Sequence, residues 1–310
     1  MNSAKAHIIF NPVAGGGKAQ KMYPELRAQF KYRIGDDYRI YTTKKQGDAI
    51  NLAARISSED IPLIICAGGD GTINEVVNGL FDQEKLINPE IELGIINCGT
   101  GSGFAQSLCL PDTLSDQIDL ILNAQGKSID LGHCTFLDKD GAKAARFFVS
   151  ECQLGIGSAV VSKVNSKHKN WGGKIAFGYI TLKEVFKCTK YPMKISYNGT
   201  DISGNMIGIV IGNGNACGGG MKLTPSARIN DSLLDLLVMH EMNIPELVRQ
   251  FTKIYSGTHI KSDRFTYVQT STIRIGSEVD VLVETDGELL GTLPVEIKVI
   301  PKSLKVKCNI

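Results

Sequence analysis

Residues 63–80 read LIICAGGDGTINEVVNGL, and this stretch decides the class of the N-terminal fold. The segment 63–67 is apolar at every position, which is typical of a strand buried on both faces of a parallel sheet. The two glycines that follow allow a sharp turn, and Thr72 with Glu75 has the spacing of a capping box, so a helix is predicted over 72–80. Strand, glycine turn and helix together predict a parallel α/β domain.

The same unit occurs twice more in the first third of the chain. A strand predicted over 6–10 precedes NPVAGGGK, residues 11–18, and one predicted over 93–97 precedes GTGSG, residues 99–103. Ligands of open parallel sheets bind at the carboxyl ends of the strands, where helix N-termini offer free N–H groups to phosphate. Each turn alone could be an ordinary loop, but three at one sheet edge predict one shared anionic ligand.

Beyond about Ser128 the pattern changes to short β-rich segments separated by Asn and Gly turns, which predicts an antiparallel β-sandwich. Two helices are expected among these strands, over 174–187 and 245–254. The domain boundary is placed within 125–132.

Composition and charge exclude several classes of protein. The chain has 310 residues, with 43% hydrophobic and 21% charged residues, which is typical of a folded protein. Its 34 Lys and Arg residues against 32 Asp and Glu residues leave a net charge of +2, so no nucleic-acid partner is expected. The eight cysteines form no CxxC pair and no apolar segment is long enough for a bilayer, so we expect a cytoplasmic protein whose membrane contact, if any, is peripheral.

Two acidic positions are candidates for chemistry. Asp70, in the turn of the first stretch, would lie among bound phosphates as a ligand to Mg²⁺ or as a positioning group; the alternative is a solvated side chain in a tight turn. Near the C-terminus, ETDGE (284–288) contains an Asp-Gly pair, the usual signal of a β-hairpin. Its three carboxylates also make it a candidate for a general base, with Asp286 and Glu288 two residues apart.

Read together, NPVAGGGK, GGDGTINEVVNGL, GTGSGFAQSL, NGNACGGGMKLTP and ETDGE resemble the diacylglycerol kinase catalytic-domain family, which includes bacterial soluble lipid kinases and is related to the sphingosine kinases. The resemblance runs in order along essentially the whole chain. It implies a nucleotide-binding α/β domain like that of NAD kinases and phosphofructokinases over 1–130, joined by the C-terminal segment of about 295–310. It also implies a β-sandwich lipid-substrate domain over 131–294.

The resemblance further implies a set of site residues. Glu288 would be the base for the lipid hydroxyl, with Asp286 and Asp70 as its catalytic partners. Mg²⁺ would bind the carboxylate of Asp231 and the carbonyls of Arg228 and Leu233. The co-substrate ATP would be held by Asn11, Pro12, Val13, Ala14, Gly15, Thr43, Gly68, Gly69, Asp70, Gly71, Thr72, Ile73, Asn74 and Thr100.

Two positions depart from the family pattern. Ser102-Gly103 stands where an Asn-Asp pair is usual, and Asn230-Asp231-Ser232 stands where Asp-Asp-Gly is usual. The first departure removes a carboxylate near the nucleotide, and the second leaves one carboxylate for the metal.

Three functions stay open at this stage. The leading one is an ATP-dependent lipid kinase, whose partners are a lipid with a free hydroxyl and a peripheral membrane surface. The second is an NAD kinase, which shares GGDGT, and the third is a nucleotide- or lipid-binding regulator without turnover. The basic segment 163–174, with Lys163, Lys167, Lys169 and Lys174, is either a solvated loop or a contact for anionic headgroups. A homodimer is left open.

Overall fold

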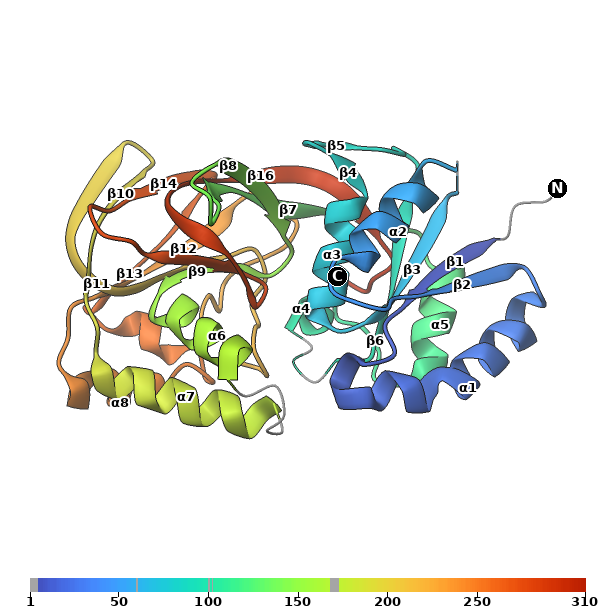
Figure 1. The fold of residues 1–310 in the computed structure, drawn as a ribbon, viewed down its shortest axis with the longest axis horizontal. Helices are drawn as coiled ribbons and strands as arrows, with labels where there is room; N and C mark the ends of the chain where they lie inside the picture. Colours follow the sequence, from blue (N-terminus) through green and yellow to red (C-terminus); the bar gives the residue numbers. More distant parts are fainter. Residues whose placement is uncertain (1–4, 60, 100, 102, 168–172) are drawn as a thin grey trace. The chain divides into compact units, whose positions relative to one another are not determined.

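The computed structural model describes residues 5–310 except 60, 100, 102 and 168–172, and it leaves the side chains of 165–178 undescribed. The chain divides into two compact units, Met1–Asp130 with Lys302–Ile310, and Leu131–Pro301 (Figure 1). Within the described residues, no helix is both long enough and apolar enough to cross a membrane.

The first unit is built on parallel strands in the order β2–β1–β3–β6. Lys305 and Val306, near the end of β16, pair in parallel with Glu92 and Leu93 of β6, so the last strand of the chain completes this sheet. The strands are β1 (Ala6–Phe10), β2 (Tyr38–Thr42), β3 (Leu63–Gly68) and β6 (Glu92–Asn97), with the short pair β4 (Phe81–Asp82) and β5 (Lys85–Leu86) outside this sheet.

Helices cover both faces of this sheet, which is why most residues of β1, β3 and β6 are buried (Figure 1). On one face, Leu26 and Phe30 of α1 and Ile118 of α5 share a core with Ile8 and Ile65 of the strands. On the other face, α2 and α3 pack closely. A Cβ at Gly79 of α3 would lie 2.8 Å from the Ala53 methyl group of α2, so there is no room for a side chain at this glycine. The helices are α1 (Ala14–Ile34), α2 (Asp48–Ser57), α3 (Asp70–Gly79), α4 (Gly103–Ser107) and α5 (Leu114–Asn123).

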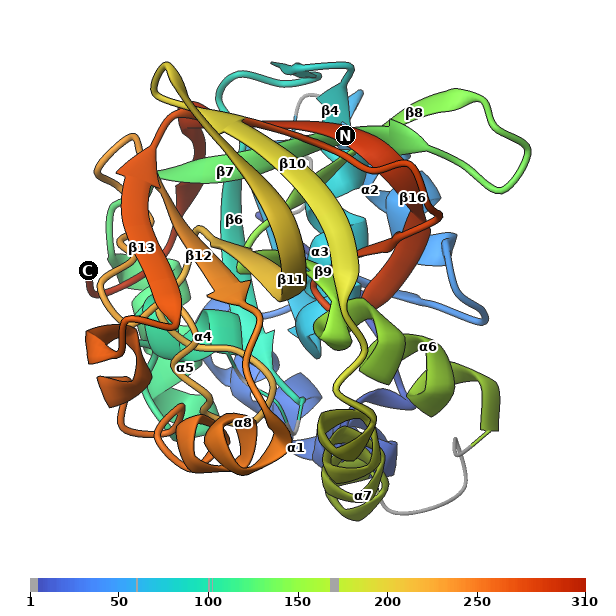
Figure 2. The ribbon, with the colours of Figure 1, turned by 90° about the vertical axis from the view of Figure 1, so that its left-hand side faces the viewer.

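The second unit is antiparallel. Its hydrogen-bonded strands follow the path β10–β14–β16–β15–β9–β11 and back to β10, so the path closes on itself. Figure 2 shows β10 to β13 side by side. The strands are β7 (Lys127–Leu137), β8 (Lys143–Phe148), β9 (Glu151–Gly155), β10 (Tyr191–Tyr197), β11 (Thr200–Gly212), β12 (Leu234–His240), β13 (Phe265–Thr270), β14 (Thr272–Gly276), β15 (Leu282–Thr285) and β16 (Glu288–Val306).

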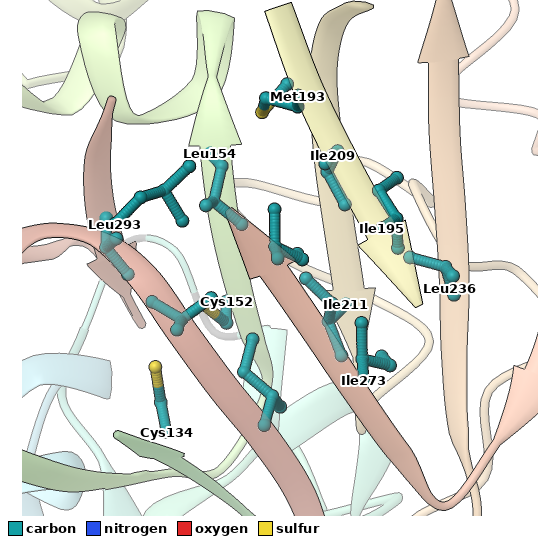
Figure 3. Packing of buried hydrophobic residues seen from close by; sticks show 14 of the residues in the cluster. Cys134, Cys152, Leu154, Met193, Ile195, Ile209, Ile211, Leu236, Ile273 and Leu293 are labelled. Carbon is teal, nitrogen blue, oxygen red and sulfur yellow. The ribbon is translucent and has the colours of Figure 1, made fainter. Parts of the chain in front are cut away.

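These strands enclose one apolar core. Side chains such as Leu154, Ile195, Ile211 and Ile273 point toward one another from four different strands (Figure 3). The long strands β11 and β16 each pair with several neighbours along their length, which joins the two layers of the expected sandwich.

Among the described residues, helices interrupt the strands at two places, between β9 and β10 and between β12 and β13. The helix expected over 174–187 is present as α7 (Gly173–Lys187), and the one expected over 245–254 is α8 (Ile244–Phe251). Sequence reasoning missed α6 (Ile156–Lys167), because its β-branched residues, among them Val160 and Val161, favour a strand in isolation. A short 3₁₀ helix, Thr258–Lys261, follows α8.

Candidate functional site

The turn after β3 begins a helix two residues earlier than expected. The helix α3 starts at Asp70 with Gly69 as its N-cap and no side-chain cap. The capping-box prediction for Thr72 and Glu75 is therefore wrong. Thr72 Oγ1 accepts a hydrogen bond from Asn11 Nδ2 at 2.8 Å, and the Glu75 carboxylate accepts from the backbone N–H groups of residues 47 and 49. Both side chains bind neighbouring loops instead of their own helix end.

Glycines in this turn are required by close approach. A Cβ at Gly68 would lie 2.6 Å from the Thr72 Cβ, and a Cβ at Gly99 would lie 2.9 Å from the Gly69 Cα. The loops after β3 and β6 are therefore in direct backbone contact, with no room for a side chain between them. The Cys98 N–H donates to the Gly68 carbonyl at 2.8 Å and ties the two loops together.

The loop after β1 reaches the same place. Asn11 donates to Thr72, and its Oδ1 accepts from the Val13 N–H at 3.2 Å. Gly15 has φ +61°, and a Cβ there would overlap the carbonyl oxygen of Cys98 at the end of β6. Gly15 and the next two residues all have positive φ, so the helical part of α1 follows this left-handed turn.

Lys18, at the end of this glycine turn, is a cation that sequence reasoning left without a role. Burial raises the pKa of the Cys98 thiol to about 11, and the Lys18 ammonium opposes that shift. A Cβ at Gly15 would lie 3.1 Å from the Lys18 Cβ and would overlap the Cys98 carbonyl oxygen, so the backbone of Lys18 lies beside the end of β6. The sequence GGGK at residues 15–18, which resembles a phosphate-binding loop, is the signal that could have identified Lys18.

The end of β2 supplies the fourth loop. The Thr43 N–H donates to the Phe10 carbonyl at 2.9 Å, and its side chain is buried. Asp48, at the start of α2, accepts the backbone N–H groups of Lys44 and Lys45 at 2.7 and 3.0 Å. The Lys44 N–H is the main cause that lowers the pKa of Asp48, so this carboxylate is ionised and closes the loop.

Asp70 is half-buried at the meeting point of these loops. Its Oδ2 accepts from the Gly103 N–H at 3.4 Å, where α4 begins. Most of the residues that the resemblance assigned to ATP thus follow the ends of four adjacent strands in one unit. Two of them, Ile73 and Asn74, have fully buried side chains, so only their backbone can face a ligand. Thr100 and Ser102 lie outside the described residues.

In the second unit, the segment 284–288 forms the expected hairpin. Thr285 pairs with Glu288, and the two residues between them, Asp286 and Gly287, have φ +48° and +86°. Positive φ at both positions is the geometry of the tight turn that an Asp-Gly pair favours. The pairing register shifts between Val283 and Glu284, so a β-bulge lies directly beside the turn.

The Asp286 carboxylate is fully engaged by backbone donors. Its Oδ2 accepts from the Val149 N–H at 2.8 Å, and its Oδ1 accepts from the N–H groups of Ser150 and Glu151 at 2.9 and 3.1 Å. The Asp286 N–H in turn donates to the Glu151 carbonyl at 3.1 Å. Asp286 therefore fixes the hairpin to the loop between β8 and β9.

Glu288 is an anion with one strong partner. Its Oε2 accepts from Arg146 Nη2 at 3.1 Å, and both side chains are about one-fifth exposed, 21% and 18% respectively. The guanidinium stabilises the ionised carboxylate while water still reaches it. Sequence reasoning missed Arg146, because only the pairing of β7 with β8 brings this residue to the hairpin.

The residues assigned to Mg²⁺ lie in the loop before β12. Asp231 Oδ1 accepts from the Leu233 N–H at 3.1 Å, its Oδ2 accepts from Gln269 Nε2 at 3.3 Å, and Arg228 is exposed nearby in sequence. Sequence reasoning missed Asp235, which is fully buried and accepts from the Tyr267 hydroxyl at 2.6 Å. Burial raises the pKa of Asp235, and the negative charge of Asp231 adds to that effect.

The basic segment 163–174 is described only in part. The Lys163 ammonium binds Glu184, a buried carboxylate on α7, so it is an internal ion pair and not a free surface charge. The side chains of Lys167, Lys169 and Lys174 lie outside the described part of the structure.

Comparison with known proteins identifies relatives along the whole chain. Residues 5–134 match the model of the diacylglycerol kinase catalytic domain, and residues 150–308 match that of the YegS C-terminal NAD kinase beta sandwich-like domain. The chain is 30% identical over 302 residues to a diacylglycerol kinase of Staphylococcus carnosus, covering 97% of this chain and 94% of that protein. It is 31% identical over 291 residues to a diacylglycerol kinase of Staphylococcus aureus, covering 94% and 88%.

Solved structures agree on the fold. A crystal structure of a Bacillus anthracis protein, provisionally classed as a diacylglycerol kinase, superposes with a TM-score of 0.76 at 26% identity and covers 100% of this chain and 98% of that one. Yeast NADH kinase complexed with NADH superposes with a TM-score of 0.54 at 13% identity and covers 99% of this chain and 83% of that one. This likeness is one of fold alone. Because the sequence relationship extends over nearly the full length of both partners, the chain belongs to the diacylglycerol kinase family.

Proposed function

We propose that this protein is an ATP-dependent lipid kinase that transfers the γ-phosphate to a lipid hydroxyl, with diacylglycerol as the first acceptor to test. The relatives named above are diacylglycerol kinases that match it from end to end. The geometric observation that carries the proposal is the contact among the loops after β1, β3 and β6 around Gly69 and Asp70. Such a concentration of glycine backbone and helix N-terminus suits a phosphate chain.

The first unit is the proposed nucleotide-binding domain. The segments Asn11–Gly15 and Gly68–Asn74 would bind the nucleotide, the second of them through the first turn of α3, with Thr43 and Thr100 completing the contacts. Gly15 and Gly69 let the backbone approach a ligand without an intervening Cβ. Lys18 adds a positive charge beside the end of β6, which favours an anion there.

Glu288 is the proposed general base. A carboxylate that stays ionised beside Arg146 can accept the proton of a lipid hydroxyl, a contribution of ~10²–10⁴-fold in rate. Asp286 is a positioning residue in this proposal, since its carboxylate accepts hydrogen bonds from the backbone N–H groups of residues 149–151. The second unit, Leu131–Pro301, is accordingly proposed to bind the lipid.

Mg²⁺ is the expected cofactor, and the residues fit a hard cation that prefers oxygen ligands. Asp70 offers a half-buried carboxylate at a helix N-terminus, where phosphates would otherwise repel it. In the second unit, the pKa of Asp235 is raised by burial and by the charge of Asp231, an excess of negative charge that a cation would relieve. Mg²⁺ bound with the nucleotide would neutralise the phosphates, and Asp70 is the carboxylate that would hold it; a separate, structural Mg²⁺ would bind Asp231.

Peripheral membrane binding is part of the proposal, and the helix α7 supports it. Tyr179, Leu182 and Phe186 are 59%, 48% and 55% exposed, and their spacing places them along one side of the helix. Lys183 is exposed on the same helix, whereas the Lys187 ammonium pairs with the buried Glu184. Exposed aromatic and aliphatic groups beside lysines suit the boundary of an anionic bilayer.

The function is tested by supplying labelled ATP and Mg²⁺ with three acceptor conditions: diacylglycerol in mixed micelles, NAD, and no acceptor. We expect label in phosphatidic acid and only background in the other two. Label in NADP would assign the protein to the soluble-substrate branch of the fold. ATP binding without label transfer to any component of a total lipid extract would make it a regulator.

A further inference from the structure

Beneath the hairpin that carries Glu288 lies a second acid, Glu284, whose side chain is fully buried at the end of β15. Its Oε2 accepts a hydrogen bond from the Gly287 N–H at 2.9 Å, so it binds the turn itself. Among the described residues, its Oε1 is buried without a hydrogen-bond partner. An ionised carboxylate with an unpartnered buried oxygen is costly, whereas a protonated oxygen becomes a donor.

The groups around Glu284 are also acidic. Glu151 on β9 is 7% exposed, and Cys217 is 5% exposed in the loop after β11. Burial is the main cause that raises the pKa of Glu284, followed by the charge of Glu151, while the Gly287 N–H opposes the shift and Asp286 adds to it. Burial likewise raises the pKa of Cys152 on β9 and of Cys217, so both thiols stay protonated.

Hydrogen bonds distinguish Asp286 from Glu284. Three backbone N–H groups donate to the Asp286 carboxylate and stabilise its ionised form, whereas Glu284 accepts from the Gly287 N–H. The charged groups of other packed elements are already paired: Glu288 of β16 with Arg146 of β8, and Lys163 of α6 with Glu184 of α7. The cations of these two pairs, Arg146 and Lys163, are therefore bound to carboxylates other than Glu284.

We propose that Glu284 is a positioning residue: it keeps a proton at neutral pH because its second oxygen is buried, and through Gly287 it holds the turn in the conformation that presents Glu288. The β-bulge next to Glu284 is where the strand register changes, so the direction of the Glu288 side chain depends on this corner of the hairpin. The inference deepens the proposed function and rests on Glu288 acting as the base.

The test compares Glu284→Gln and Glu284→Leu with the exposed control Glu278→Gln. A glutamine amide reproduces the neutral acid, because its oxygen accepts from Gly287 while its NH₂ group replaces the protonated oxygen. We expect Glu284→Gln to keep kcat within about threefold of wild type, and Glu284→Leu to lose about 10-fold or more with an unchanged KM for ATP, since only the base is misplaced. Equal losses in both variants, or wild-type kcat in Glu284→Leu, would overturn the positioning role.

A second readout needs no activity. Because the folded pKa of Glu284 is raised above its unfolded value, the stability that its burial contributes is present below the unfolded pKa and is lost as pH rises through the folded pKa. The urea midpoint of Glu284→Gln should therefore gain on that of wild type as pH rises from 5 to 9, while Glu278→Gln stays parallel to wild type. A midpoint difference that is constant with pH would show that Glu284 is ionised throughout, and this result stands even if the chain proves inactive on lipids.

Discussion

The β3–α3 turn and the β15–β16 hairpin are both short glycine-containing turns with an aspartate, yet they are built differently. The first is shaped by backbone: glycines at 68, 69 and 99 let two loops touch, and Asn11 joins a third loop to Thr72. The second is shaped by carboxylates, since Asp286, Glu288 and Glu284 each bind a different partner. In the first turn, glycine backbone lets loops from different strands touch, whereas in the hairpin the carboxylate side chains bind partners from distant strands.

The largest effect is expected at the carboxylate of the first turn. Asp70→Asn should abolish phosphoryl transfer while the protein still folds, because the side chain is half-buried in a turn and not in the core. Transfer of label from ATP and the urea midpoint are measured together. The control Asp82→Asn changes an exposed aspartate of the same unit and should leave both unchanged. Near wild-type transfer in Asp70→Asn would remove this residue from the machinery.

In the hairpin, Asp286→Asn should cost both rate and stability. Whichever way the amide turns, its NH₂ group faces a backbone N–H donor of residues 149–151, which costs about 1–3 kcal/mol in free energy of unfolding. The displaced hairpin should lower kcat by about 10²-fold. Exposed Asp280→Asn is the matched control. An unchanged unfolding free energy would contradict the role of these three hydrogen bonds.

Two neighbouring glycines separate close approach from backbone conformation. Gly15 and Gly16 have φ +61° and +66°, but a Cβ would meet the Cys98 carbonyl only at Gly15 and nothing within 4 Å at Gly16. Both alanine variants should lose about 1–2 kcal/mol in free energy of unfolding, because alanine disfavours the left-handed conformation. Gly15→Ala alone should also raise the KM for ATP, several-fold. Equal KM values for the two variants would mean that the loop does not need to lie against β6.

The smallest effect concerns the membrane surface. Replacing Tyr179, Leu182 and Phe186 together by serine should weaken co-sedimentation with anionic vesicles a few-fold, since apolar burial at the bilayer is lost. Tyr32→Ser, at an 88% exposed site on α1, is the control. Binding should also weaken with salt as the Debye length falls below ~8 Å. Unchanged co-sedimentation of the triple variant would place any membrane contact elsewhere.

The two turns also differ in how much of each could be predicted from the sequence. The strand ends of the first unit could be predicted, because each glycine turn directly follows an apolar strand in the sequence. The capping box failed because Thr72 and Glu75 find better partners in loops that are 61 and 28 residues away. The Asp-Gly hairpin could be predicted from its own residues. Arg146 and Glu151 could not, because strand pairing across more than 130 residues brings them to it.

The central claim is that Glu288 accepts the proton of the lipid hydroxyl, and steady-state kinetics of Glu288→Gln with diacylglycerol test it most directly. The amide still accepts from Arg146, so the fold is preserved while the basic oxygen is lost. We predict that kcat falls by at least ~10²-fold with little change in the KM for ATP, because the loss is confined to the transition state. If kcat and KM both stay within a small factor of wild type, or if only the KM for ATP rises, Glu288 is not the base.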